Sequence, residues 1–266
     1  SYGYQASIAL PLLENGMPFG ALTIYAAEAD AFNEKEIALL EEMAGDLSYG
    51  IHMLRVGIER DQSRVEQQQM LERMQAGLVE TVEAIAATVE MRDPYTAGHQ
   101  RRVADLARAI AVELGMDEQL IQGIFLASIV HDLGKIGIPA EILSYPGRFS
   151  EVQLAMVREH AQIGFDILKD IHFPWPIAQM VLQHHERMDG SGYPQGLKGE
   201  DILPEARIMA VADVVEAMAS HRPYRAGLGL DIALEEIEKN SGRLYDSKVV
   251  GACLRLFREQ DYKIPG

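Results

Sequence analysis

Apolar residues recur at helical spacing along most of the chain. Between residues 33 and 54 they fall at every third or fourth position, at Ile37, Leu40, Met43, Leu47, Ile51 and Leu54. This spacing places them on one face of a helix and predicts that the helix begins near Asn33. Beyond residue 93 the same periodicity predicts further helices near residues 98–114, 117–131, 150–169, 174–187, 204–220, 230–240 and 247–260.

The first 30 residues follow a different pattern. Residues 6–12 and 20–26 are short apolar runs, and the turn-forming residues Asn15 and Gly16 lie between them, which predicts two strands. The hairpin "PLLENGMPFGALTIYA" and the following "AFNEKEIALLEEMAGDLSYGI" resemble the C-terminal half of a GAF sensory domain. Because the earlier part of that fold is missing, we expect residues 1–56 to be a truncated GAF-like segment with too few strands to close a ligand pocket.

The segment from residue 57 to residue 92 contains no proline and predicts a long signalling helix, in which residues 57–79 are a linker before a domain of residues 80–266. Its apolar stripe shifts phase between Asp61 and Leu71, so a coiled coil would be irregular there. A narrow apolar stripe needs a partner to cover it. We therefore favour a parallel homodimer through residues 47–89, with a solvated spacer helix of a monomer as the alternative.

Composition and charge narrow the class of partner. Of the 266 residues 48% are hydrophobic, which is enough for a folded core, and the formal net charge is −16. Such a charge argues against a nucleic-acid polymer or an anionic membrane as main partner, but it allows a small phosphorylated ligand. The single cysteine, Cys253, lies in an apolar stretch, which favours a core position in a reducing cytoplasm. We find no signal peptide and no apolar run of about 18 residues, so we expect a soluble cytoplasmic chain.

The candidate chemistry lies at the ends of apolar segments. Five of the eight histidines lie near acidic residues or glycines: His99, His131, His160, His184 and His185. Two carboxylates share this setting, Asp132 after the apolar run "IFLASIV" and Asp213 within "ARIMAVADVVEAMAS". Any one of these groups alone would be typical of a hydrogen-bonded core residue. Seven together predict that the helix ends converge on metal ions, because buried carboxylates are costly unless they are paired or bind a cation.

Six segments carry a closer resemblance: "RDPYTAGHQRRV", "HDLGKIGIP", "PGRFS", "REHAQIG", "HHERMDGSGYPQGL" and "ADVVEAMASHRPYR". In order and spacing they resemble the motifs of the HD-GYP family of cyclic di-GMP phosphodiesterases, over roughly residues 80–262. The fold implied is mainly α. It is an HD-type helical bundle preceded by the long helix and the GAF-like remnant.

The resemblance also implies a role for each residue. One metal ion would be held by His99, His131 and Asp213. The second would be held by His160, His184 and His185, and Asp132 would bridge the two ions. A hydroxide between the metals would then attack phosphorus.

The substrate contacts implied by the resemblance are cationic or aromatic. Lys135, Arg222 and Arg225 would contact phosphate, and Tyr193 would shape the wall of the pocket. The sequence departs from the family pattern at Ala161, where proline is usual, and at Met188, where an aromatic residue is frequent. Neither departure removes a ligand.

We expect two divalent ions, with iron as first choice and manganese as second. One helical turn before the first of these histidines, some members of the resembled family have a glutamate, and that glutamate reaches a third ion. Here that position is Tyr95, whose neutral phenol is a poor metal ligand, so a third ion is not expected.

The reaction implied is hydrolysis of cyclic di-GMP to pGpG, with GMP as the product of a second step. No base-specific contact is visible in the motifs, so a related cyclic dinucleotide such as 3′,3′-cGAMP stays open as substrate. A signalling module that binds the dinucleotide with little turnover is the other alternative, although the complete ligand set argues against it. GGDEF-domain proteins are candidate partners.

Overall fold

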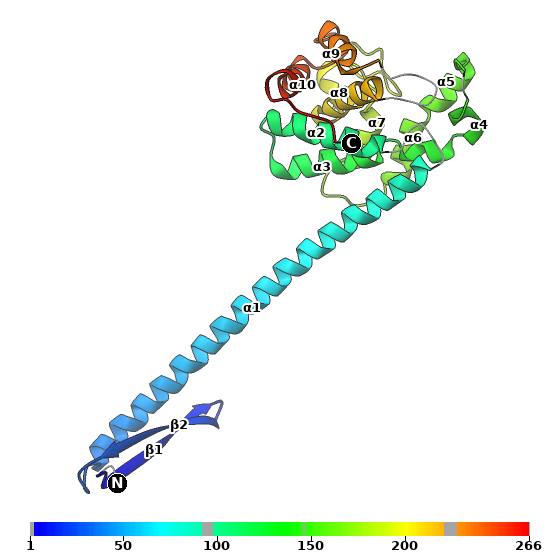
Figure 1. Ribbon diagram of the computed structural model, residues 1–266. Helices are drawn as coiled ribbons and strands as arrows, with labels where there is room; N and C mark the ends of the chain where they lie inside the picture. Colours follow the sequence, from blue (N-terminus) through cyan, green and yellow to red (C-terminus); the bar gives the residue numbers. More distant parts are fainter. Residues whose placement is uncertain (1–2, 92–97, 146, 221–227, 266) are drawn as a thin grey trace. The chain divides into compact units, whose positions relative to one another are not determined.

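The computed structural model describes residues 3–91, 98–145, 147–220 and 228–265, which are mainly helical (Figure 1). The chain divides into two compact units, residues 1–76 and residues 77–266. The mainly α fold class predicted from the sequence is confirmed.

The first unit begins with an antiparallel hairpin. Strand β1 (Ala6–Glu14) pairs with β2 (Met17–Ala26), and the register shifts between Leu12 and Leu13. The turn residues Asn15 and Gly16 have φ of 49° and 78°, the left-handed region that glycine and asparagine tolerate best. The two predicted strands are confirmed, and both are longer than the apolar runs that predicted them.

Helix α1 (Glu34–Glu90) is one continuous helix of 57 residues. It begins where the sequence predicts, because the Asn33 side chain accepts hydrogen bonds from the backbone amides of Lys35 and Glu36, and Glu36 in turn accepts from the Asn33 amide. The helix passes without a break through residues 56 and 79, the limits of the expected linker. Most of its apolar side chains between residues 39 and 78 are exposed.

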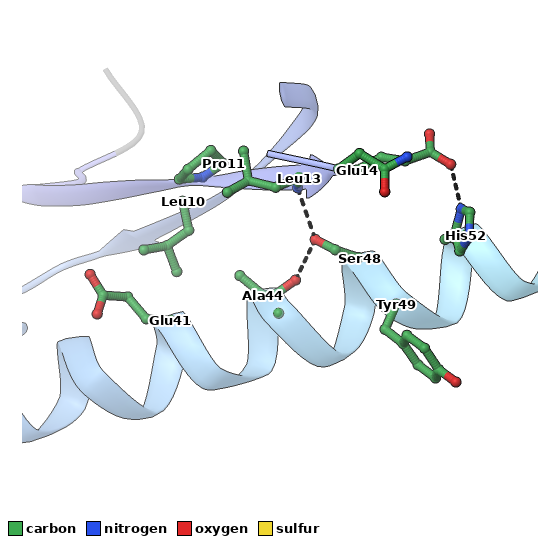
Figure 2. A pocket seen from close by; sticks show the side chains of 11 residues that line it. Leu10, Pro11, Leu13, Glu14, Glu41, Ala44, Ser48, Tyr49 and His52 are labelled. Carbon is green, nitrogen blue, oxygen red and sulfur yellow. Dashed lines mark hydrogen bonds and ion pairs between the residues drawn. The ribbon is translucent and has the colours of Figure 1, made fainter. Parts of the chain in front are cut away.

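An open groove of about 490 Å³ lies between β1 and α1 in the first unit (Figure 2). Its floor contains Leu10 and Ala44, and Ser48 accepts a hydrogen bond from the Leu13 amide at 3.1 Å. Tyr49 on its rim is 67% exposed, so the two strands leave the groove open to solvent.

The second unit contains the last turns of α1 and a set of shorter helices. They are α2 (His99–Glu113), α3 (Glu118–Val130), α4 (Ala140–Leu143), α5 (Glu151–Arg158), α6 (His160–Leu168), α7 (Ile177–Gln183), α8 (Pro204–Ala219), α9 (Leu230–Lys239) and α10 (Ser247–Glu259), with 3₁₀ helices η1 (Leu133–Gly137) and η2 (Gly199–Asp201). The seven helices predicted beyond residue 93 are confirmed, except that the one expected at 150–169 is two helices, α5 and α6, which meet at Glu159.

One apolar core holds the second unit together. Helix α2 packs against both α3 and α8, and α7, α9 and α10 complete the core. Its fully buried side chains include Leu106, Ile124, Met180 and Ile208. Cys253 is also fully buried, and burial raises the pKa of its thiol to about 12, which confirms the core position predicted from the sequence.

One described segment, Glu118–Gly137, is long and apolar enough to cross a membrane by composition alone. Its apolar window is 67% buried within the helical unit, as in the core helix of a globular domain.

Candidate metal centre

The structure brings all seven predicted metal ligands together in the second unit. Most of these residues lie at the ends of helices. His99 begins α2, and His131 and His184 directly follow α3 and α7. Asp213 lies within α8. The break between α5 and α6 places His160 at the start of α6. Five of the seven are less than 5% exposed, namely His99, His131, Asp132, His160 and His184.

Two groups of candidate ligand atoms match the two sets implied by the resemblance, and a third group, His131, Asp132 and His184, joins one set to the other. In one group, His99, His131 and Asp213 each offer an atom within 4.8 Å of the others. The same criterion joins His160, His184 and His185. Three donor atoms at this separation can share one metal ion.

Two carboxylates lie between the groups. Asp132 Oδ2 lies 3.6 Å from His131 Nε2, and Asp132 Oδ1 lies 3.5 Å from His160 Nε2. Asp132 therefore has one oxygen toward each group, as a bridging ligand requires. Asp213 also reaches both groups, because its Oδ1 is 3.3 Å from His99 Nε2 and its Oδ2 is 3.9 Å from His185 Nδ1. The contact between Asp213 and His185 was not foreseen from the sequence.

Three of the histidines are oriented by a backbone carbonyl group of the preceding turn of the chain. In each, Nδ1 donates a hydrogen bond to the carbonyl oxygen three residues earlier, at 2.6, 2.7 and 2.5 Å for His131, His160 and His184. A carbonyl oxygen only accepts, so Nδ1 carries a proton and, in the neutral ring, Nε2 keeps its lone pair; the Nε2 atoms of His160 and His184 lie 3.3 Å apart. Each Nε2 consequently presents the lone pair that a metal ion needs.

His99 is oriented by a carboxylate instead. Its Nδ1 bonds to Glu216, which is 1% exposed and also accepts from Arg102 Nε at 2.6 Å and Ser220 Oγ at 2.5 Å. Sequence reasoning missed Glu216. A signal was present, because Glu216 follows Asp213 by three residues and therefore lies on the same face of α8.

The surroundings of the cluster shift the pKa values of its carboxyl and imidazole groups. Burial alone would raise the carboxyl pKa of Asp132, but Lys135 and the neighbouring histidines outweigh it and hold that pKa well below its usual value. Burial and the neighbouring histidines His131 and His160 lower the pKa of His184 to about 3. Burial would also lower the pKa of His99, yet its hydrogen bonds to Asp213 and Glu216 raise it to about 9. Ionised carboxylates and neutral imidazoles are the forms that bind metals, so His99, with its raised pKa, must lose a proton before it can bind an ion.

Lys135 lies beside the bridging carboxylate, with Nζ 2.7 Å from Asp132 Oδ2. The sequence placed it one turn beyond His131 on condition that the helix continued. That condition is wrong, because α3 ends at Val130 and Lys135 lies in η1. Within η1, a Cβ at Gly134 would lie 1.9 Å from the His160 carbonyl oxygen, so only glycine lets η1 approach α6 this closely.

Tyr193 covers one side of the second ligand group. Its ring centroid is 4.7 Å from that of His185, and the Arg158 guanidinium carbon lies 5.1 Å from the Tyr193 ring centroid. The loop that carries Tyr193 is held by Glu186, whose buried carboxylate accepts hydrogen bonds from three consecutive amides, those of Gln195, Gly196 and Leu197, at 2.7, 3.2 and 3.0 Å. Sequence reasoning missed Glu186 and Arg158, although each stands within two residues of a predicted ligand.

Three residues named from the sequence lie outside the described residues. They are the two predicted phosphate contacts, Arg222 and Arg225, and Tyr95, on which the expectation of two metal ions rests.

Comparison with known families identifies this arrangement. The HD domain profile matches residues 80–249, a stretch that contains all seven ligands. The chain belongs to the HD domain family. A GAF domain profile matches residues 3–52, so the likeness of the first segment to part of a GAF domain is also found. The resemblance stated from the motifs is confirmed.

Curated relatives of this HD domain chain are phosphodiesterases by name. It is 44% identical over 184 residues to a cyclic di-GMP phosphodiesterase of Thermotoga maritima, covering 68% of this chain and 50% of the relative. It is 41% identical over 178 residues to the cyclic di-GMP phosphodiesterase response regulator RpfG of Xanthomonas campestris, covering 66% of this chain and 47% of the relative. The chain thus spans about half the length of these relatives.

A solved structure supports the HD domain fold. The chain matches an HDG"Y"P protein of Bdellovibrio bacteriovorus with a TM-score of 0.51 at 21% identity, over 60% of this chain and 51% of that one. At this identity the likeness concerns the fold alone.

Proposed function

We propose that this chain hydrolyses cyclic di-GMP to linear pGpG as a metal-dependent phosphodiesterase, with GMP as the product of a second step. The observation that carries the proposal is the pair of ligand groups with Asp132 between them. The two relatives above, at 41% and 44% identity, support cyclic di-GMP as substrate through their names.

The ligand set supports a dinuclear site. We assign His99, His131 and Asp213 to one divalent ion and His160, His184 and His185 to the other, with Asp132 shared. Imidazole and carboxylate ligands suit first-row transition metals, and iron is our first choice and manganese our second. When bound, such ions would supply Lewis acidity and a water molecule of lowered pKa.

The protein's own residues would bind and orient the substrate. Lys135 lies beside Asp132 and would offer its ammonium group to a phosphate oxygen once a metal ion takes over the charge of Asp132. Tyr193, whose ring lies tilted against that of His185 and whose loop is held by Glu186, would form the wall against a guanosine moiety. We keep Arg222 and Arg225 as phosphate contacts on the basis of the family motif.

Turnover by metal-loaded protein tests the function. Protein loaded anaerobically with iron or manganese should convert cyclic di-GMP to pGpG, and Asp132→Ala should abolish the conversion. 3′,3′-cGAMP serves as competing substrate, because a relative of 34% identity is named a 3′3′-cGAMP-specific phosphodiesterase. If the protein binds cyclic di-GMP but hydrolyses none of it when loaded with either iron or manganese, the chain is a signalling module instead. Faster hydrolysis of 3′,3′-cGAMP than of cyclic di-GMP would make 3′,3′-cGAMP the substrate.

We also propose that the chain forms a homodimer through α1. The support is the row of exposed apolar side chains on this helix, among them Leu47, Leu71 and Leu78 at 43%, 57% and 45% exposure. Light scattering should give twice the monomer mass, and Leu78→Asp should lower the mass. Gln69→Asp, which adds the same charge at an exposed polar position on the face of α1 opposite Leu78, should leave it unchanged. A strictly monomeric wild type at tens of micromolar would exclude the dimer.

A cytoplasmic location and GGDEF-domain partners complete the proposal. The single buried cysteine supports a reducing compartment. The net charge of −16 argues against an anionic membrane or a nucleic-acid polymer as partner. Fractionation of cells that produce the chain, followed by co-purification with GGDEF-domain proteins, would test both points.

A further inference from the structure

The backbone around His99 lacks the usual local support. His99 is the first residue of α2, and its N-cap is Gly98, which has a φ of 72° and no side chain that could accept a hydrogen bond. The first amides of a helix have no partner inside it and need an acceptor from elsewhere. A metal ligand placed here therefore depends on a group outside α2.

Glu90, the last residue of α1, supplies that acceptor. Its Oε2 accepts a hydrogen bond from the Gly98 amide and its Oε1 accepts one from the Gln100 amide, both at 3.1 Å. The two amides belong to the residues on either side of His99. One carboxylate thus holds the backbone of the ligand from both neighbours, and its negative charge lies at the positive end of α2.

The position of Glu90 is fixed by the packing of its own helix turn. Ala86 and Val89 are each 4% exposed and belong to the core of the second unit. Two helical turns before Glu90, Glu83 forms an ion pair with Arg101 of α2. The end of α1 is therefore attached to the start of α2 by packing and by charge.

The ring of His99 is fixed from the opposite side. Its Nδ1 bonds to Glu216 and its Nε2 lies 3.3 Å from Asp213. These contacts set the direction of the ring, whereas Glu90 sets where the backbone begins. Metal–ligand distances tolerate only a few tenths of an ångström, so both constraints are needed.

We propose that Glu90 is a positioning residue of the metal centre, through which the last turn of α1 fixes the backbone of His99 and a displacement of α1 changes metal binding. The proposal rests on the metal centre proposed above and not on which dinucleotide is hydrolysed.

The direct test compares four variants in the full chain. Glu90→Ala removes both acceptors, Glu90→Gln removes one acceptor and the charge, and Glu90→Asp keeps the charge on a shorter stem. Glu80→Gln is the matched control, an exposed carboxylate on the same helix. NMR hydrogen exchange of the metal-free protein should show faster exchange at both Gly98 and Gln100 in Glu90→Ala, at one of these two amides in Glu90→Gln, and wild-type exchange in Glu80→Gln.

Manganese titration followed by electron paramagnetic resonance provides the second readout. Glu90→Ala should weaken binding of one of the two ions by about tenfold, the lower end of the effect of residues that orient a ligand. The ion held by His160, His184 and His185 should bind as in the wild type, and Glu90→Asp should recover part of the loss. Wild-type exchange and wild-type affinity for both ions in Glu90→Ala would overturn the proposal.

The coupling to α1 has its own test. Ala86→Val overfills the core under the last turn of α1 and, in the wild-type background, should weaken binding of the same manganese ion that Glu90→Ala affects. In the Glu90→Ala background it should cause no further loss, because the connection is already removed. Additive losses would overturn the coupling. If the wild type binds two ions but leaves cyclic di-GMP intact, the proposed function is refuted. The role of Glu90 would still be decided by the exchange and manganese-binding results.

Discussion

Two Asp–Lys pairs in the second unit share their spacing and their geometry but not their surroundings. Asp132–Lys135 and Asp166–Lys169 are both separated by three residues, and in both the lysine Nζ lies 2.7 Å from a carboxylate oxygen. The side chains of the first pair are 5% and 16% exposed, and those of the second are 48% and 44% exposed. Distance and spacing alone therefore do not distinguish a reactive pair from a surface pair.

The two carboxyl groups differ in what keeps them ionised. Burial would raise the pKa of Asp132, and it stays ionised because Lys135 and several histidines surround it. The pKa of Asp166 is lowered mainly by its hydrogen bond from Lys169, with water available on the other sides. A buried carboxylate among imidazoles is a site for a cation, whereas an exposed ion pair is weak because solvent screens it.

The largest effect should come from Asp132→Ala. The variant loses the carboxylate that faces both ligand groups, so metal content and hydrolysis should fall together. We expect a loss greater than the roughly 10²–10³-fold that removal of one transition-state hydrogen bond causes. Asp166→Ala is the matched control and should keep wild-type metal content and rate. Wild-type metal and rate in Asp132→Ala would show that the centre is wrongly assigned.

Lys135→Met should separate substrate binding from metal binding. Without its ammonium group, kcat/KM for cyclic di-GMP should fall by about a hundredfold, because a charged hydrogen bond to phosphate is lost. Metal affinity should stay the same or increase, since a cation that competes for Asp132 is gone. Lys169→Met, assayed side by side, should change neither quantity. A Lys135→Met protein that loses its metal would place the lysine in metal binding instead.

Glu216→Gln tests whether a buried carboxylate matters without being a metal ligand. The amide keeps the size of the side chain but weakens the bond that orients His99, so metal affinity should fall by about tenfold. Isothermal titration with manganese would measure it. The change should affect one ion only, and equal weakening of both ions would contradict a role through His99.

The smallest effect should come from Asp166→Asn. Its pKa is lowered in the folded state, so any stability it contributes is present above the usual carboxyl pKa and is lost as the pH falls through the folded value. Thermal unfolding at neutral pH should differ from wild type by no more than experimental error, and added salt should remove any difference. A clear loss of stability that resists salt would show that exposure does not weaken this pair.

Much of the second unit was determined by local sequence. Apolar spacing predicted α2, α3 and α7 to α10, and gave α5 and α6 as one helix, because a period near 3.6 residues is present in each segment independently; the short α4 was not predicted. The seven candidate metal ligands were named from residue type and from the order of the family motifs. Their convergence was foreseeable, since carboxylates and imidazoles at the ends of apolar helices have few stable environments other than a cation site.

Only the tertiary structure showed which residues hold those ligands in place. Glu216 meets His99 across 117 residues of sequence, and Glu90 accepts hydrogen bonds from amides eight and ten residues later in the chain. The approach of Gly134 to the His160 backbone depends likewise on η1 packing against α6. Such contacts leave no periodic signal, because they depend on where separate elements meet, and a single sequence specifies that only through the packing of the whole core.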